Sequence, residues 1–232
     1  MNIFKNEKHR QAFLFITSFL LFITVSFSLS YKHTIPQETK ISKVKKLENK
    51  MEATSETNKR VSPSYKVTNT TTITGEELDQ SLSGEFKGLG DLFVQAAEKN
   101  EIDPVFLVAV AAQETGWGQS DIAGAPWNNI GGMICMPGNY QEIFGADYPN
   151  LGCEETVLGG TKWQRFISVE DSIQFKAAYL KMKYVDNGKE TITEIQQKYA
   201  PTNATNDKEG LNNHWMNNVI AIMNSVKEKL YV

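Results

Sequence analysis

Residues 103–120 read DPVFLVAVAAQETGWGQS, and the fold is organised around them. Asp103 can cap a helix, and Pro104 suits the first helical position because its missing N–H would be unpaired there anyway. The residues from 105 to 112 are apolar without a break, which is typical of a helix buried on all sides. Gly116 supplies the left-handed conformation that commonly ends a helix. This pattern predicts a central helix with the rest of the domain packed around it.

Glu114 lies near the end of that helix, on the same face as Leu107 and Val110. A carboxylate on an apolar helix is costly to bury, so its presence there needs a reason. Desolvation and the partial negative charge of a helix C-terminus both favour the protonated form, which general acid catalysis requires. Glu114 is therefore our candidate general acid. The alternative is a glutamate that simply reaches water at a frayed helix end.

The charge distribution separates the beginning of the chain from the rest. Residues 1–66 hold 12 Lys and Arg against five Asp and Glu, whereas residues 86–232 hold 12 against 18. Because phosphate neutralisation needs a basic patch, the acidic part argues against nucleic-acid binding. The chain has three scattered histidines, so we expect neither a metal site nor a cofactor.

The first 30 residues have the pattern of a targeting segment. Lys5, Lys8 and Arg10 precede an uncharged run dominated by Phe, Leu and Ile. Such a segment is typical of an export signal, and about 20 apolar residues can also span a bilayer uncleaved. We expect a signal peptide or membrane anchor at 1–30 and an extracytoplasmic location for the rest. Residues 31–85, rich in Lys, Glu, Ser, Thr and Asn, predict a disordered linker.

Residues 86–232 predict a mostly α (α+β) domain with one small β lobe. Helical periodicity indicates helices near 89–100 and 168–187, one that ends near residue 199, and a last one near 212–230. Short β-prone runs flank Gly159 and Gly160, which predicts a hairpin. Cys135 and Cys153 are the only cysteines. An oxidising compartment favours a disulfide between them, worth about 3 kcal/mol; two buried free thiols are the alternative.

Aromatic residues gather in the loops that follow Glu114. Trp117 stands between two glycines, Trp127 follows ten residues later, and Tyr199 adjoins a later loop. Each aromatic alone is more often a core residue than a binding residue. Sugars present apolar C–H faces and many hydroxyls, so the combination of aromatics, amides and a carboxyl indicates a carbohydrate cleft.

The stretch AAQETGWGQSDIAGAPWNNIGG at 111–132 resembles the signature of the bacterial peptidoglycan glucosaminidase family, endo-beta-N-acetylglucosaminidases with a lysozyme-like fold. RFISVEDSI at 165–173 and KYAPTN at 198–203 resemble two further segments of that family, in the same order. The resemblance covers roughly residues 88–230. It implies a lysozyme-like helical domain with a β-hairpin lobe, and an exported enzyme that cuts the β-1,4 bond after N-acetylglucosamine in peptidoglycan.

The resemblance also implies roles for individual residues. Glu114 would protonate the glycosidic oxygen, and the substrate-binding residues would be Trp117, Trp127, Asn128 and Tyr199. In the family a second carboxylate comes from the strand before the hairpin turn, where this chain has Glu154 and Glu155. Adjacent strand residues face opposite sides, so at most one of them points into the cleft, and we favour Glu155. Alternatively, the 2-acetamido group of the substrate could act as the nucleophile.

The chain departs from the family pattern around the expected cleft. The family usually has an aromatic or Leu-Phe before the loop glycine and Ile-Lys after it, whereas here Asn129-Ile130 and Gly132-Met133 flank Gly131. The insertion between the two cysteines is also unusual. Two other functions therefore stay open: a lysozyme-type muramidase or lytic transglycosylase, and a non-catalytic wall-binding scaffold protein.

Overall fold

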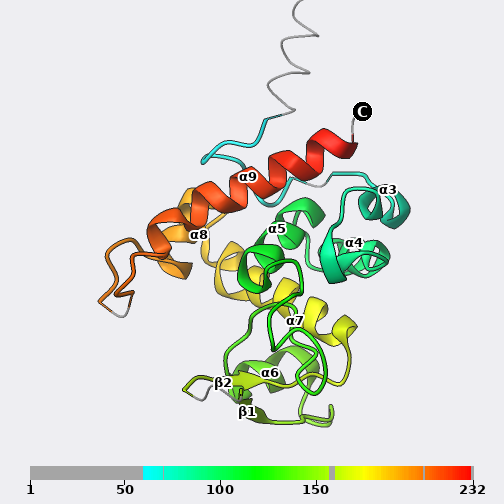
Figure 1. Ribbon diagram of the computed structural model, residues 1–232, viewed down its shortest axis with the longest axis vertical. Coiled ribbons are helices and arrows are strands. Elements are labelled where there is room, and N and C mark those ends of the chain that lie inside the picture. The colour runs from blue at the N-terminus through cyan, green and yellow to red at the C-terminus, as the bar shows by residue number, and fades with distance from the viewer. Residues whose placement is uncertain (1–59, 70, 157–159, 206, 231–232) are drawn as a thin grey trace, which may run out of the picture. The chain divides into compact units, whose positions relative to one another are not determined.

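Helix α5 (Pro104–Thr115) forms the centre of the molecule (Figure 1). The Asp103 carboxylate accepts hydrogen bonds from the N–H groups of Val105 and Phe106, at 2.7 and 3.2 Å. Gly116 ends the helix in the left-handed conformation, with φ 57° and ψ 48°. Every residue from 104 to 112 is buried. The predicted central helix and both of its caps are confirmed.

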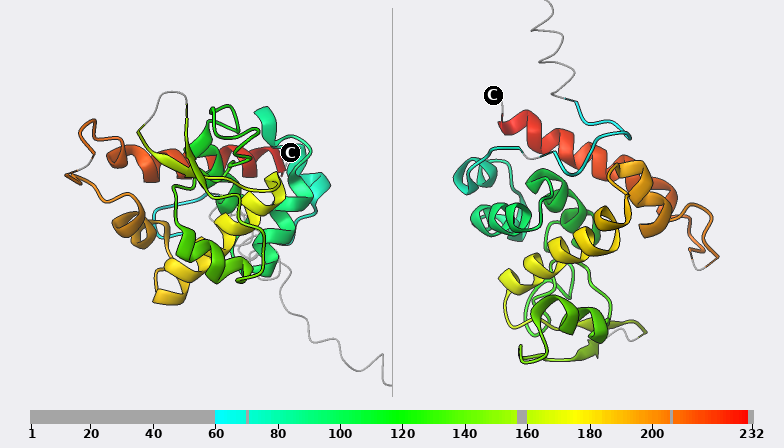
Figure 2. Two further views of the ribbon diagram at one scale, coloured as in Figure 1. Left: turned by 90° about the horizontal axis from the view of Figure 1, so that it is seen from below. Right: turned by 180° about the vertical axis from the view of Figure 1, so that it is seen from behind.

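The computed structural model describes residues 60–69, 71–156, 160–205 and 207–230. Besides α5, the described elements are α3 (Gly75–Asp79), η1 (Gly84–Phe86), α4 (Gly90–Lys99), α6 (Pro137–Phe144), β1 (Cys153–Glu155), β2 (Lys162–Gln164), α7 (Val169–Lys183), η2 (Val185–Asn187), α8 (Ile192–Tyr199) and α9 (Asn212–Leu230). Helix α5 contacts α4, α7 and α9. Figure 2 shows α9 crossing one end of the described domain, remote from the β lobe and α6. The mostly α class with a small β lobe is confirmed.

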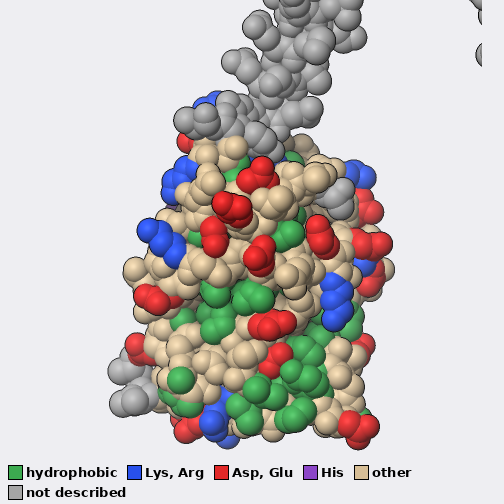
Figure 3. All heavy atoms as spheres, turned by 90° about the vertical axis from the view of Figure 1, so that its right-hand side faces the viewer, with side chains coloured by type: hydrophobic (Ala, Val, Ile, Leu, Met, Phe, Trp, Pro, Cys, Tyr) green, Lys and Arg blue, Asp and Glu red, His purple; other side chains and the backbone are tan. Residues whose placement is uncertain are grey.

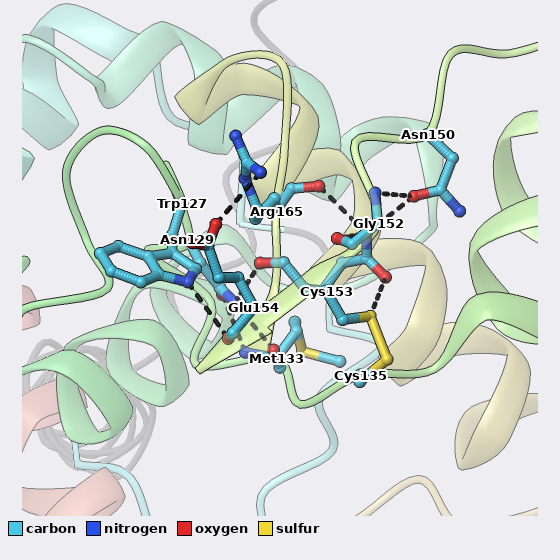
Figure 4. The surroundings of a disulfide bond; sticks show 10 residues. Trp127, Asn129, Met133, Cys135, Asn150, Gly152, Cys153, Glu154 and Arg165 are labelled. Carbon is cyan, nitrogen blue, oxygen red and sulfur yellow. Dashed lines mark hydrogen bonds and ion pairs between the residues drawn. A yellow bond between two sulfur atoms is a disulfide. The ribbon is translucent and has the colours of Figure 1, made fainter. Parts of the chain in front are cut away.

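The β lobe is an antiparallel hairpin with Glu154 opposite Trp163 and Glu155 opposite Lys162. A bridge between Ile134 and Trp163 adds a short edge segment along β2. The predicted hairpin is thus confirmed. The disulfide is confirmed as well, because Cys135 and Cys153 are bonded with their Cα atoms 5.6 Å apart. Figure 4 shows this bond between the edge segment and β1.

Helix α6 lies inside the insertion between the cysteines and was not predicted. Pro137 occupies its first turn, where proline is well tolerated. Its Tyr140 is buried in a second hydrophobic cluster with Met133, Phe166 and Phe175. Tyr140 therefore forms the buried side of this short helix.

The predicted linker boundary at residue 85 is wrong. Val67 and Leu78 are fully buried in the main core. The Val67 N–H donates to the carbonyl of Glu190 at 2.8 Å, and the Val61 N–H donates to the Asn224 side chain at 2.8 Å. Thr74 and Glu77 form a capping box that starts α3. Residues 60–85 are polar on average, but their few apolar side chains are buried against elements that are distant in sequence. The average composition of the segment does not reveal this packing.

The predicted segment 1–30 and the first part of the predicted linker lie outside the described residues. In the ranges that are described, none of the helices combines the length and the apolar character needed to cross a membrane.

The face formed by α3 and α4 is acidic. Figure 3 shows Asp and Glu side chains gathered over the upper part of this face. Glu76 and Glu77 lie in the first turn of α3, and Asp91 lies in that of α4. These charges would repel a phosphate backbone, so this face is unsuited to nucleic acid.

Candidate active site

Glu114 lines a cavity of about 410 Å³ at the C-terminal end of α5. Its carboxylate oxygen Oε1 accepts a hydrogen bond from Nε1 of Trp215 at 3.2 Å. The aromatic wall consists of Tyr179, Tyr184, Tyr199 and Trp215. The remaining lining residues are Gln113, Gly132, Met133, Ile134, Met136, Ala200, Leu211 and Asn212. A carboxyl thus faces a cavity with an aromatic wall, a combination that is suited to binding a sugar.

The loop at 129–133 passes directly over Glu114. Asn129 is fully buried, and its side-chain amide donates to the carbonyls of Met133 and Gln164 at 2.7 and 2.9 Å. Its oxygen accepts from the Met133 N–H at 2.8 Å. These bonds hold Gly132 at φ 62°, where an added Cβ would lie 2.6 Å from the Cβ of Glu114. The glycine that departs from the family pattern is required by this close contact.

Lys176, from α7, is buried beneath the cavity. Its Nζ donates to the hydroxyl of Tyr199 at 2.6 Å and lies 4.9 Å from the centre of that ring. Burial lowers the pKa of Lys176 to about 8, although the negative charge of Glu114 acts to raise it. Burial also raises the pKa of Tyr199, and interaction with the Glu114 carboxylate raises it further. Glu114, Tyr199 and Lys176 therefore form one electrostatic group.

The structure brings two of the predicted site residues, Glu114 and Tyr199, into the same cavity. Trp117 does not line it: the ring packs against Phe86, with centroids 5.8 Å apart, and the Trp117 carbonyl accepts from the Glu85 N–H at 3.0 Å. Asn128 is also turned away, since its side-chain amide donates to the carbonyls of Phe166 and Ile167. Their positions indicate that Trp117 and Asn128 shape the loops, and neither lines this cavity. Sugar contact by these two residues stays a prediction.

Trp127 and the two β-lobe acids lie beside the cavity rather than in its wall. In Figure 4 the Trp127 indole points to the backbone of Glu154, whose carbonyl accepts its N–H at 3.4 Å. The Glu154 carboxylate forms an ion pair with Arg165 at 3.1 Å. Glu155 is exposed and lies opposite Lys162 in the hairpin. Of the two acids, Glu154 is therefore the one whose carboxylate is paired with a cation, Arg165.

Several cavity residues were missed by reasoning from the sequence. Trp215 lies on the buried face of α9 with Val219, Met223 and Val226, so its helical spacing suggested a core residue. Tyr179 lies within α7 and Tyr184 directly follows it, so both likewise resembled residues of a packed helix. The one sequence signal for Lys176 was its position among the apolar residues of α7. No cluster of three or more potential metal ligands occurs among the residues described.

Comparison with known proteins places this geometry in context. The family model named Glucosaminidase, described as mannosyl-glycoprotein endo-beta-N-acetylglucosaminidase, matches residues 90–228. Among solved structures, a catalytic mutant of S. aureus autolysin E in complex with the disaccharide NAG-NAM is similar, with 16% identity and a TM-score of 0.50 over 73% of this chain and 75% of that chain. Autolysin E with a bound muropeptide gives 18% identity and a TM-score of 0.50, covering 72% of each chain. No curated protein sequence matches.

Proposed function

We propose that this chain, which belongs to the glucosaminidase family whose model matches residues 90–228, is an exported peptidoglycan hydrolase that cleaves the β-1,4 bond after N-acetylglucosamine. The observation that carries the proposal is the position of Glu114, a carboxyl at the end of a buried helix that faces an aromatic cavity. The ligands named for autolysin E are cell-wall glycan fragments, which supports the same substrate class here.

In the proposed reaction, Glu114 protonates the glycosidic oxygen while the bond between that oxygen and the sugar C1 breaks. The Trp215 N–H, which donates to Oε1 of Glu114, stabilises the carboxylate that remains. Water then adds to C1, and its proton goes to a base. The aromatic wall offers stacking surfaces for the apolar faces of the sugar rings.

For the opposite side of the sugar we propose Glu155 as the carboxylate that directs the water. It is the better candidate because its neighbour Glu154 is already paired with Arg165. Neither acid lines the cavity in this structure, so the proposal requires the β lobe to approach Glu114 when glycan binds. A reaction assisted by the 2-acetamido group remains the alternative, and it would make Glu155 dispensable.

We also propose an extracytoplasmic site of action. A disulfide within the domain supports this, since such bonds persist in oxidising compartments. Residues 1–30, outside the described part of the chain, would act as the export signal or anchor. The membrane contact is thus a proposal that rests on the sequence pattern of Lys5, Lys8, Arg10 and the apolar run after them.

The test of the proposed function is Glu114→Gln assayed by release of soluble fragments from purified peptidoglycan. Loss of the general acid should lower turnover by about 10²–10⁴-fold. Glu142→Gln is the matched control, because that acid forms an exposed ion pair with Lys183 at 3.3 Å, outside the cavity. Wild-type digestion by Glu114→Gln would overturn the proposal.

Mass spectrometry of the digested glycan separates the related activities. Reducing-end N-acetylglucosamine supports the proposal, whereas reducing-end muramic acid indicates a muramidase and anhydro-muramic ends indicate a lytic transglycosylase. A scaffold protein would instead bind peptidoglycan equally well with Glu114 or Gln at position 114 and would digest nothing.

A further inference from the structure

Lys176 is a buried cation with no role in the proposed reaction of Glu114. Only 1% of its surface is exposed. Among the described residues it forms no ion pair with a carboxylate, and its side chain instead donates to a neutral phenol, that of Tyr199, at 2.6 Å. Removing an ammonium group from water costs several kcal/mol unless it is compensated. A lysine held in this way beside the candidate acid calls for an explanation.

The chemistry of the two groups fixes the direction of hydrogen bonding. An ammonium carries three donors and no acceptor, so the Tyr199 oxygen must accept from Lys176. The phenol's own hydrogen is then left to point elsewhere. Glu114 is the carboxylate whose charge and interaction with the phenol raise the pKa of Tyr199, and both residues line the same cavity.

We propose that Lys176 is a positioning residue, which turns the Tyr199 O–H toward Glu114 so that the carboxylate left by proton transfer receives two donors. The first donor is the Trp215 N–H at 3.2 Å. The second would be the phenol of Tyr199, which lines the same cavity as Glu114. This inference rests on the proposed role of Glu114 as general acid. Donors already in place when the charge develops stabilise the transition state without reorganisation.

At the opposite end of α5 a lysine, a tyrosine and a carboxylate form one hydrogen-bonded chain. There Nζ of Lys227 donates to the Tyr65 hydroxyl at 3.0 Å and lies 4.4 Å from the ring centre. The Tyr65 hydroxyl in turn donates to the carboxylate of Asp103, the helix N-cap. Lysine therefore directs a tyrosine onto a carboxylate elsewhere in this molecule, in a place remote from the cavity. It supplies a control for the test.

The groups that face Lys176 and Tyr199 come from three elements and an adjoining turn. They are Glu114 on α5, Tyr179 on α7, Tyr184 after α7 and Tyr199 itself on α8. A second cation, Lys198, lies over the Tyr184 ring, 5.4 Å from its centre. The positive charge of Lys176 interacts with the negative charge of Glu114, and loss of a cation weakens this attraction. The pH dependence of turnover should therefore report on it.

The experiment compares Lys176→Met, Lys176→Arg and Lys227→Met in the full chain, with peptidoglycan as substrate. We expect Lys176→Met to lower kcat by about tenfold to hundredfold with KM changed less than about twofold, and to move the alkaline limb of the pH profile to higher pH. Lys176→Arg should keep the alkaline limb of the pH profile where it lies in the wild-type protein. Lys227→Met should lower the melting temperature but leave kcat and the limb unchanged.

A Lys176→Met variant with the wild-type kcat and pH profile would overturn the inference, and so would an equal change of the profile in Lys227→Met. If Lys176→Met fails to fold, the wild-type protein labelled with ¹³C at tyrosine Cζ decides. The Tyr199 resonance, assigned by its loss in Tyr199→Phe, should shift with a midpoint near the pKa of Lys176, about 8. A resonance that stays fixed from about pH 6 to about pH 10 would refute the coupling.

Parallel assay of Glu114→Gln separates the two proposals. If Glu114→Gln is inactive while Lys176→Met behaves as the wild type, only the role of Lys176 fails. If Glu114→Gln is fully active, the general acid assignment itself fails, whatever Lys176→Met does.

Discussion

Trp215 donates its indole N–H to Glu114 at 3.2 Å, across 101 positions of the chain. The indole is 4% exposed and packs against the Tyr199 ring, with centroids 5.1 Å apart. Because the donor is held by this packing, the carboxyl that it contacts is held as well. The first turn of α9 therefore belongs to the candidate active site, although the rest of that helix serves the core.

Trp215→Phe should weaken catalysis more than stability. The phenyl ring keeps much of the packing but removes the N–H, and a hydrogen bond to a charged group contributes about 1.5–3 kcal/mol. We expect kcat to fall at least tenfold, measured by fragment release, while circular dichroism shows an intact fold. Unchanged kcat in a folded Trp215→Phe protein would contradict a role for this hydrogen bond.

Gly132→Ala should inactivate the enzyme. The new Cβ would lie 2.6 Å from the Cβ of Glu114 at a backbone φ of 62°, so both a collision and backbone strain follow. Gly188→Ala is the matched control, because Gly188 has φ 74° and open space around its Cβ position. Both variants should lose about 1–2 kcal/mol of unfolding free energy from strain. Only Gly132→Ala should lose activity, and equal activity of the two would refute the contact.

Glu155→Gln should lower kcat at least a hundredfold if Glu155 directs the water. Glu154→Gln removes a half-exposed ion pair with Arg165, whose contribution to stability is at most about 1 kcal/mol, and should leave kcat within about threefold. Single-turnover kinetics on defined glycan fragments measure both. Full activity of Glu155→Gln would favour participation of the 2-acetamido group.

Removal of residues up to 85 should unfold the domain, whereas a chain that begins at residue 60 should keep a cooperative transition. The longer deletion removes Val67, Leu78 and Leu82 from the core, where each is at most 2% exposed. Each such side chain contributes about 1.5–3 kcal/mol, which together approaches the whole stability of a typical domain. Thermal denaturation of the two shortened chains provides the measurement. Equal melting temperatures would restore the original linker boundary.

Replacement of both Cys135 and Cys153 by serine should lower the unfolding free energy by about 3 kcal/mol, since the bond closes a loop of 18 residues. Urea denaturation tests this. A reductant should destabilise the wild-type protein by a similar amount and leave the double variant unaffected. A reductant effect on the double variant would show that the loss comes from some other source.

The central helix and the start of α7 were readable from the sequence because their ends depend on groups a few residues apart. Asp103 caps the N–H groups two and three residues later, Ser168 accepts from Asp171 N–H at the start of α7, and Gly116 ends α5 by its own backbone freedom. The hairpin and the disulfide followed from equally local signals and from the number of cysteines. Helix α6 escaped because its buried face depends on Phe166 and Phe175, which come later in the chain.

The sequence by itself determined the central helix, its terminal glutamate and the class of chemistry that such a carboxyl serves. Only the tertiary structure decided which further side chains lie near that carboxyl: Trp215 and, through Tyr199, Lys176 rather than Trp117 and Asn128. Capping and periodicity arise from neighbours in the chain, so they can be read from it directly. A cavity wall is assembled by packing helices whose residues are far apart in sequence, and the direction in which each buried side chain points is fixed only when those helices meet.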